Sequence, residues 1–397
     1  MVLVLWGRRL NFPHAAAGGH PARGEAGDSY SRWVRTAMKA ASDWPEAAAL
    51  FESTMREPTE LLIGVVRDAF AGGITDRYES VFAEGNRFVV GHVAARHGVP
   101  PEQVIGTTGA TAALALVLKA LVGPGDEVLI EHPRFDLLPA LARDAGATVA
   151  DLPRRAPDYR VDPAELARLI TPNTRLIVLT QVHNPSGAVL DVAELQALGA
   201  VAARAGVPIL MDEVYADFTG QDVYAAQLGP QFISVGSLTK VQGLFALKCG
   251  WAVASPQMVA AIHAASPQGD LGVSKLAHAV AALVLEQREV FDAHWRNVLA
   301  GARPVVEEHV ALMRADGLIE GELPNFGCMY FPRIVGVDDT RALTGWLWSE
   351  HGVVLPAGEF FGQAGHVRIG FGSGRVDALD RGFSRLRTAL KAYPGRC

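Results

Sequence analysis

Apolar residues recur along this chain with two different spacings. Between residues 29 and 70 they are three or four positions apart, which predicts helices that each bury one face. From residue 103 onward, short apolar runs alternate with helix-like stretches. The expected strands are 104–107, 127–130, 148–152, 176–180 and 207–211, and the expected helices are 110–122, 136–145, 163–170 and 192–205. Such alternation predicts βαβ units and a mostly parallel sheet between helices, which is the α/β fold class.

The pattern changes after residue 285. A long amphipathic stretch over 291–315 and a last one over 377–393 enclose short expected strands and one further helix. This arrangement predicts a smaller α+β domain at the C-terminal end. We therefore expect four parts, which are a loose tail over 1–28, a helical segment over 29–70 that packs with the small domain, a large domain over 71–287 and a small domain over 288–397.

Composition and charge exclude several classes of function. Of the 397 residues, 49% are hydrophobic and 20% are charged, which is typical of a globular protein. The net charge of −6 argues against a nucleic-acid partner, since that would need a basic surface. No apolar run reaches the roughly 18 residues of a membrane span, so we expect no membrane partner. The three cysteines are sparse and lack the spacing of metal ligands, which favours a cytoplasmic location and no bound metal.

One lysine lies where a long cation is costly. Lys240 follows an apolar run over 232–235 and precedes another over 249–254, and Ser237 comes three residues before it. A lone lysine in such a loop would more often extend its charge into solvent. A lysine that loses its charge by desolvation can instead form a Schiff base with a carbonyl, and pyridoxal phosphate (PLP) is the cofactor that uses this chemistry.

Residues that follow other expected strands supply further parts of a PLP site. Asp212 ends a buried strand, where a carboxylate can pair with the ring nitrogen of the cofactor. Tyr215 and Asn184 can bond the phenolic oxygen of the ring, and Phe135 can stack on it. Each has an ordinary alternative when taken singly, namely a helix cap for Asp212, a turn for Asn184 and packing for the two aromatic residues.

A phosphate and a carboxylate each have a candidate binding group. Gly109, Ala110 and Thr111 join an expected strand to a helix, whose first N–H groups can hold a phosphate. The alternative is an ordinary helix cap by Thr108. No G-x-G-x-x-G sequence follows the first strand, so a dinucleotide site is disfavoured. Arg368, in a short strand of the small domain, can hold a substrate carboxylate with two parallel N–H bonds, whereas a surface ion pair is the alternative.

Several motifs together resemble those of the class I/II aminotransferases, which are PLP enzymes of fold type I. The resemblance runs from about residue 78 to the C-terminus. It rests on Gly109-Ala110-Thr111, Asn184-Pro185-Ser186-Gly187, Asp212-Glu213-Val214-Tyr215, Ser237-x-Thr239-Lys240 and Val367-Arg368-Ile369-Gly370. It implies a large PLP-binding domain with a mostly parallel sheet between helices, and a smaller α+β C-terminal domain.

The resemblance also implies a role for each matched residue. Lys240 corresponds to the Schiff-base lysine, Asp212 to the partner of the pyridine nitrogen, and Arg368 to the arginine that binds the substrate carboxylate. Contacts with the cofactor are implied for Gly109, Ala110, Thr111, Phe135, Asn184, Tyr215 and Ser237, and a substrate contact also for Asn184. Tyr78 resembles a tyrosine that reaches the partner subunit's phosphate, so a homodimer with shared sites is expected. Lys248 stands where the family usually has an arginine near the phosphate.

The reaction that the resemblance implies is transfer of the amino group of an α-amino acid to a 2-oxo acid, with Lys240, Asp212 and Tyr215 as catalytic residues. Relatives with acidic substrates bring a second arginine from the segment after the lysine loop. Residues 255–287 contain no arginine, so we expect a non-acidic side chain. Two other interpretations stay open. One is a different PLP reaction on the same site, such as that of a C–S β-lyase, a decarboxylase or a cyclase, and the other is a non-catalytic PLP-binding regulator domain.

Overall fold

A sheet of seven strands forms the centre of the computed structural model, which describes residues 29–44, 46–79, 85–265 and 272–395. The strands are β2 (Val104–Thr107), β3 (Glu127–His132), β4 (Thr148–Pro153), β5 (Thr174–Thr180), β6 (Ile209–Asp212), β7 (Phe232–Ser237) and β8 (Gly250–Val253). Their order in the sheet is β2-β8-β7-β6-β5-β3-β4. β8 runs antiparallel to both of its neighbours, β2 and β7, and the other pairs are parallel. The predicted α/β fold with a mostly parallel sheet is confirmed. The expected tail over 1–28 lies outside the described residues.

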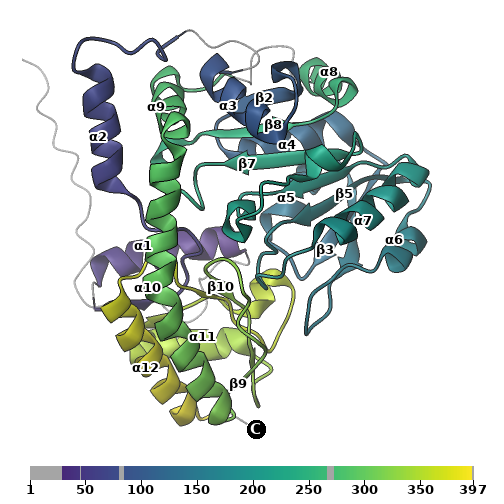
Figure 1. The fold of residues 1–397 in the computed structure, drawn as a ribbon. Coiled ribbons are helices and arrows are strands. Elements are labelled where there is room, and N and C mark those ends of the chain that lie inside the picture. Colours follow the sequence, from purple (N-terminus) through teal and green to yellow (C-terminus); the bar gives the residue numbers. More distant parts are fainter. Residues whose placement is uncertain (1–28, 45, 80–84, 266–271, 396–397) are drawn as a thin grey trace, which may run out of the picture.

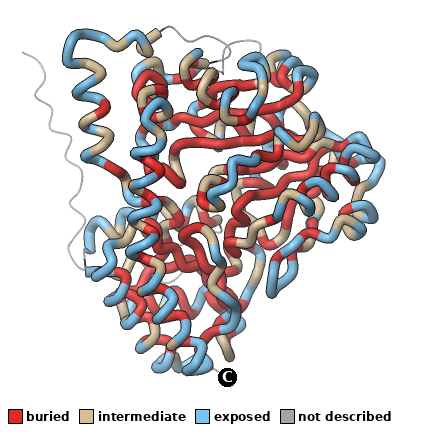
Figure 2. The backbone as a smooth tube through the Cα atoms, in the orientation of Figure 1, coloured by how far each residue is buried: buried red, intermediate tan, exposed pale blue. Residues whose placement is uncertain are grey.

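Helices cover both faces of this sheet (Figure 1). One face packs against α4 (Ala110–Leu121), α5 (Leu137–Asp144) and α8 (Pro256–Ala265), and the other against α6 (Pro163–Leu169) and α7 (Val192–Ala205). Successive side chains of a strand point to opposite faces. Val128 and Ile130 therefore join the first core and Leu129 the second. Figure 2 shows the result, with the strands buried along most of their length and the outer helix surfaces exposed.

A smaller body lies below the sheet in Figure 1 and contains the C-terminal part of the chain. Its helices are α10 (Arg288–Ala315), α11 (Thr340–His351) and α12 (Val376–Ala392), and α10 packs along α12. Two short antiparallel pairs complete it, β9 (Ile319–Glu320) with β11 (Arg333–Ile334) and β10 (Met329–Tyr330) with β13 (Ile369–Gly370). These elements share one apolar core, which explains why the helical spacing of 291–315 and 377–393 is amphipathic.

The N-terminal segment divides between the two bodies. It contains α1 (Tyr30–Asp43), β1 (Ala48–Ala49) and α2 (Thr59–Phe70). β1 pairs in parallel with β12 (Val353–Val354) of the smaller body, and Trp33 of α1 packs in the same cluster as Val354. In contrast, α2 packs along α9 (Lys275–Glu286), because its apolar face joins a cluster that contains Val280 and Val284. Within the segment 29–70, β1 thus joins the smaller body and α2 packs on α9, and the expected division into domains stays a prediction.

Local signals account for several helix ends. Asp191 and Glu194 form a capping box at the start of α7, and Gly206 ends that helix in the left-handed conformation. The side chain of Asn86 caps α3 (Arg87–His97), and Gly98 ends it in the same way as Gly206 ends α7. Within the described ranges, no helix is both long and apolar enough to cross a membrane.

Candidate active site

The polar residues expected at the site gather at one edge of the central sheet. Asp212 is the last residue of β6, Lys240 follows the end of β7, and Asn184 follows the end of β5. These three strands are neighbours in the sheet and run in the same direction. Because the carboxyl ends of parallel strands meet at one edge, residues far apart in sequence come together there.

Lys240 lies on the loop between β7 and β8 and points toward the N-terminal segment. Its Nζ atom is 3.3 Å from Thr54 Oγ1 and 5.9 Å from the centre of the Tyr215 ring. The loop itself is held by the N–H of Met55, which donates to the Lys240 carbonyl at 2.9 Å. Burial lowers the pKa of the Lys240 ammonium. The amine is therefore shifted toward the neutral form, which is the nucleophile and the base.

Asp212 is a buried carboxylate without a cationic hydrogen-bond partner among the described residues. One oxygen accepts the N–H of Val214 at 3.3 Å, and only 6% of the residue is exposed. Burial raises the pKa of Asp212 to about 6, and the charge of Glu131 adds to this effect. A positively charged group beside Asp212 would oppose this shift, so the site suits a protonated ring nitrogen.

Tyr215 is fixed by a contact from the N-terminal segment. Its hydroxyl is 2.8 Å from Ser53 Oγ, and its ring stacks on Phe218 with centroids 6.2 Å apart. Burial raises the pKa of the Tyr215 phenol, so the group stays protonated and can donate a hydrogen bond.

The start of α4 packs closely against the backbone that follows the Lys240 loop. Gly109 precedes the helix with a φ of 88° and no side chain caps the first turn. Gly250 lies directly against it, since a Cβ atom there would be 2.5 Å from the Gly109 carbonyl carbon and 2.7 Å from the Ala110 nitrogen. The N–H groups of Ala110 and Thr111 thus stand at a helix N-terminus without a side-chain cap. Ser237 ends β7, and its Oγ accepts the N–H of Thr239 at 3.3 Å.

Arg368 is fully enclosed at the junction of the two bodies. Only 1% of the residue is exposed. One terminal nitrogen donates to Asn184 Oδ1 at 2.9 Å, and the other donates to the Phe51 carbonyl at 3.0 Å and to the Tyr30 hydroxyl. Arg368 and Asn184 are therefore brought together, and they lie beside residues of the N-terminal segment.

Within the part of the chain that the structure describes, no hydrogen bond joins two of the predicted residues, Lys248 and Tyr78, to the site residues described above. Lys248 has a left-handed backbone with a φ of 48°, and its Nζ lies 3.6 Å from the centre of the exposed Phe245 ring. Tyr78 lies before α3, where the Nζ atom of Lys275 is 4.3 Å from the centre of its ring. The roles expected for Lys248 and Tyr78 stay predictions.

Comparison with known protein families matches residues 85–386 to the family described as aminotransferase class I and II. The match covers well over half of the 397 residues. The chain belongs to the class I and II aminotransferases.

Individual relatives of this aminotransferase agree in fold but differ in name. Capreomycidine synthase of Streptomyces vinaceus is 32% identical over 76% of this chain and 78% of its own length. The structure of N-succinyldiaminopimelate aminotransferase from Mycobacterium tuberculosis has a TM-score of 0.77 and 26% identity, and covers 90% of this chain and 97% of that one. The structure of a PLP-dependent cyclase, OrfR, has a TM-score of 0.80 and 25% identity, with coverages of 94% and 99%. The predictions of the family, of PLP as cofactor and of an amino-transferring enzyme are confirmed.

The residues of this aminotransferase fit PLP. Lys240 offers an amine with a lowered pKa, Asp212 a buried carboxylate without a cation, and the first turn of α4 a set of N–H groups for a phosphate. When bound, PLP supplies a carbonyl for the amine and a ring that takes up electrons from the substrate's Cα. In that state Asp212 would hold the ring nitrogen protonated, and Lys240 would move a proton at Cα.

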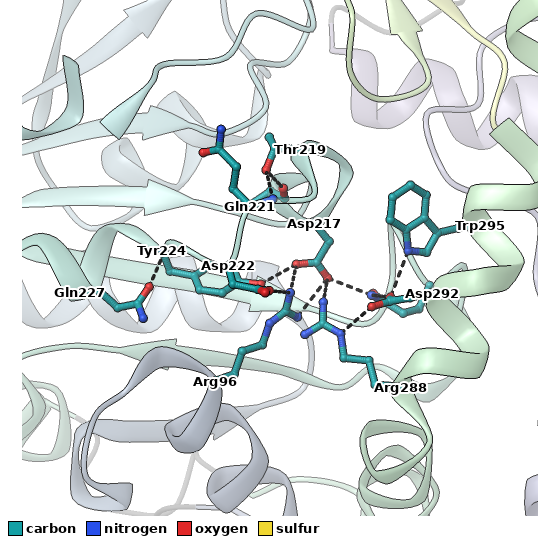
Figure 3. A network of polar contacts seen from close by, with 12 residues as sticks. Arg96, Asp217, Thr219, Gln221, Asp222, Tyr224, Gln227, Arg288, Asp292 and Trp295 are labelled. Carbon is teal, nitrogen blue, oxygen red and sulfur yellow. Dashed lines mark hydrogen bonds and ion pairs between the residues drawn. The ribbon is translucent and has the colours of Figure 1, made fainter. Parts of the chain in front are cut away.

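A polar network ties the loops that carry Tyr215 and Lys240 to neighbouring helices (Figure 3). The Asp217 carboxylate accepts hydrogen bonds from Arg96 at 2.8 and 3.3 Å, from Tyr224 at 2.8 Å and from Gln242 at 2.9 Å. Arg288, at the start of α10, pairs with the same carboxylate at 3.2 Å. Asp217 lies two residues after Tyr215, and Gln242 lies two residues after Lys240. The network therefore fixes both loops against α3 and α10.

A second buried network was not predicted from the sequence. Glu131 ends the apolar part of β3 and pairs with Arg154 at 2.8 Å, and neither side chain is exposed. Glu131 also accepts the Thr180 hydroxyl at 2.5 Å, and Thr180 Oγ1 accepts the N–H of Asn184 at 3.1 Å. This chain of contacts positions Asn184. The sequence offered one indication of this ion pair. Glu131 and Arg154 are charged residues that follow two expected parallel strands.

Three contacts from the N-terminal segment were also missed. Tyr30, Ser53 and Thr54 touch Arg368, Tyr215 and Lys240 respectively. No motif marks them, because they lie outside the part of the chain that resembles the family. Only the amphipathic spacing of α1 indicated that this segment packs against something.

Proposed function

We propose that this aminotransferase moves the amino group of an α-amino acid with a non-acidic side chain to a 2-oxo acid. One observation carries the proposal. Buried Arg368 bonds Asn184, and its charge acts on both the Tyr215 phenol and the Lys240 amine. An arginine there can hold the α-carboxylate by two parallel N–H bonds. The substrate's Cα is then presented to the Lys240 amine, which takes its proton.

The side chain of the substrate is proposed to be neutral or basic. Residues 255–287 contain no arginine that could bind a second carboxylate. In addition, the Asp136 carboxylate lies at the start of α1, where it accepts hydrogen bonds from the N–H and the hydroxyl of Ser31 at 3.4 and 3.5 Å. Burial raises the pKa of Asp136, and the bonds from Ser31 only partly offset this effect. When ionised, this carboxylate, on which the Arg368 charge acts, would repel an acidic substrate group placed beside it.

We also propose a homodimer in which Tyr78 acts in the neighbouring subunit's site. Apolar side chains are exposed near Tyr78 and near the lysine loop, among them Ile74, Phe245 and Leu276. Burial of these side chains against a second copy would be favourable. Mixing inactive Tyr78→Phe and Lys240→Ala chains tests this, because a shared site predicts partial recovery of activity in the mixed dimer. No recovery above either parent would contradict it.

The compartment and the domain limits are retained as proposals. A cytoplasmic location is supported by Cys249 and Cys328, which are both buried free thiols. A boundary near residue 288 is supported by the start of α10, which comes after the turn that ends α9.

Cyclisation is a second candidate reaction, because a PLP-dependent cyclase shares the fold over 94% of this chain. Lys240 and Asp212 would serve such a reaction equally well, since they act on the Cα proton and do not select the later steps. The choice of reaction then depends on the groups around Arg368.

A single experiment separates the two candidates. The purified enzyme with PLP is incubated with a panel of amino acids, and the cofactor spectrum and the products are followed together. Transamination predicts conversion of the cofactor to pyridoxamine phosphate and one 2-oxo acid per turnover. A product that keeps its α-amino nitrogen while the cofactor is unchanged would favour cyclisation. Aspartate or glutamate as the best donor would contradict the proposed side-chain class.

A further inference from the structure

The first residue of α1 occupies the space next to the carboxylate-binding arginine. Tyr30 is 8% exposed, and its hydroxyl accepts a hydrogen bond from a terminal nitrogen of Arg368. Its ring also lies over the guanidinium, with 4.6 Å between the Arg368 Cζ atom and the ring centre. Phe361 lies over the same guanidinium at 4.9 Å. Arg368 is thus enclosed by aromatic rings and engaged at its edge by a phenol.

Both terminal nitrogens of Arg368 are already engaged in hydrogen bonds. One terminal nitrogen is directed at Asn184, and the other is shared between Tyr30 and the Phe51 carbonyl. The Nε atom is buried and has no hydrogen-bond partner within the described chain. A carboxylate needs two donors of a guanidinium on one edge. With the phenol in place, each edge of the guanidinium already has at least one engaged donor.

We infer that the Tyr30 phenol holds the carboxylate position on Arg368 and that an incoming substrate must displace it. The inference rests on the proposed role of Arg368 in binding the α-carboxylate. An anionic carboxylate accepts a stronger hydrogen bond from a guanidinium than a neutral phenol does, so the exchange favours an acid over a neutral ligand. Tyr30 thereby makes entry to the site depend on a carboxylate.

The surroundings of Tyr30 explain why it stays in place without substrate. Its ring lies 5.8 Å from the rings of Trp33 and Phe135 and 5.4 Å from that of Phe361. The next residue, Ser31, bonds Asp136 through both its N–H and its hydroxyl. Aromatic packing and these bonds hold the start of α1 over the site, so the phenol competes at a high local concentration.

The test measures binding of propionate, an unreactive monocarboxylate without an amine, to the PLP-loaded enzyme by calorimetry. Tyr30→Phe keeps the ring packing and removes the competing hydroxyl. It should bind propionate about tenfold more tightly than the parent, because one charge-assisted hydrogen bond no longer has to be broken. Tyr330→Phe is the matched control, since its buried phenol bonds the Gly321 carbonyl instead of Arg368 and its loss should leave propionate affinity unchanged.

Further arms keep the inference open to refutation. Tyr30→Leu should change affinity in the same direction, which covers the case in which Tyr30→Phe does not fold. Propionamide, which has the same shape but no charge, should bind more weakly than propionate to the parent, because a neutral amide replaces the phenol on the guanidinium less readily than a carboxylate does. Suppose that propionate binding is unchanged or weaker in the Tyr30 variants and is lost in Arg368→Ala. This result would refute competition by Tyr30 and leave the proposed role of Arg368 intact. Unchanged binding in Arg368→Ala would instead refute the proposed role of Arg368.

Discussion

The proposed cofactor half and the proposed substrate half of the site are assembled in different ways. Asp212 and Lys240 follow neighbouring parallel strands, and Ala110 starts the helix after the first strand of the same sheet. Their polar groups have few internal partners, as the Asp212 carboxylate and the uncapped start of α4 illustrate. In the substrate half, Arg368 comes from the smaller body and is bonded by Asn184, Phe51 and Tyr30.

This difference separates what is common to the fold from what selects the substrate. Groups at strand ends are held by the hydrogen bonds of the sheet, so they keep their arrangement whatever is bound. Groups drawn from α1 and the smaller body are held by side-chain contacts that a ligand can replace. We therefore expect changes in the cofactor half to abolish the chemistry and changes in the substrate half to alter affinity and selection.

Removal of the Lys240 amine is expected to have the largest effect. Lys240→Ala should lower kcat by at least about a thousandfold, because the group that moves the Cα proton is absent. Borohydride reduction of the parent enzyme followed by peptide mapping should find the cofactor on Lys240. A label on Lys248, or near-normal turnover of Lys240→Ala, would show that the cofactor half is wrongly assigned.

Replacement of Asp212 should reveal the cost of its burial. The pKa of Asp212 is raised from 3.8 to about 6, so the folded state binds the proton more tightly than the unfolded state does. This carboxylate therefore destabilises the cofactor-free protein as pH rises through that interval, by roughly 3 kcal/mol above pH 6. Asp212→Asn should be more stable than the parent at pH 8 and about equal to it at pH 4, although its activity falls.

Thermal unfolding of the cofactor-free proteins at both pH values measures this effect. Glu131→Gln, measured at the same two pH values, is the control for the removal of a buried charge. Glu131 is paired with Arg154, so this variant should be less stable than the parent. Equal melting temperatures of Asp212→Asn and the parent at pH 8 would contradict this prediction. They would show that neighbouring groups stabilise the ionised Asp212 carboxylate even without the cofactor.

Truncation of Arg368 should affect the substrate half and leave the cofactor half intact. Arg368→Ala should lower kcat/KM for every amino acid about a hundredfold, or about 2.7 kcal/mol, since a bidentate pair with the carboxylate is lost. The PLP content of the purified variant should match that of the parent. Loss of PLP together with activity would show that the two halves are not separable.

Substitution of Lys248 is expected to have the smallest effect. Its ammonium lies over the exposed Phe245 ring, outside the hydrogen-bonded cluster around Lys240. Lys248→Ala should therefore weaken PLP binding by less than tenfold, under about 1.4 kcal/mol, because exposed charges are screened by solvent. Equilibrium dialysis with PLP gives the value. A larger loss would place Lys248 at the phosphate after all.

The sequence by itself determined the alternation of strands and helices along the chain and the residues that follow the strand ends. Lys240, Asp212 and Asn184 could be found because short-range patterns set strand and helix boundaries, and parallel strands end at one edge. The tertiary structure alone decided how the substrate half is built. Tyr30 meets Arg368 across 338 positions, and the packing of α1 against an aromatic cluster brings them together. Such a contact leaves no periodic signal, since it depends on where two separate bodies meet rather than on neighbours along the chain.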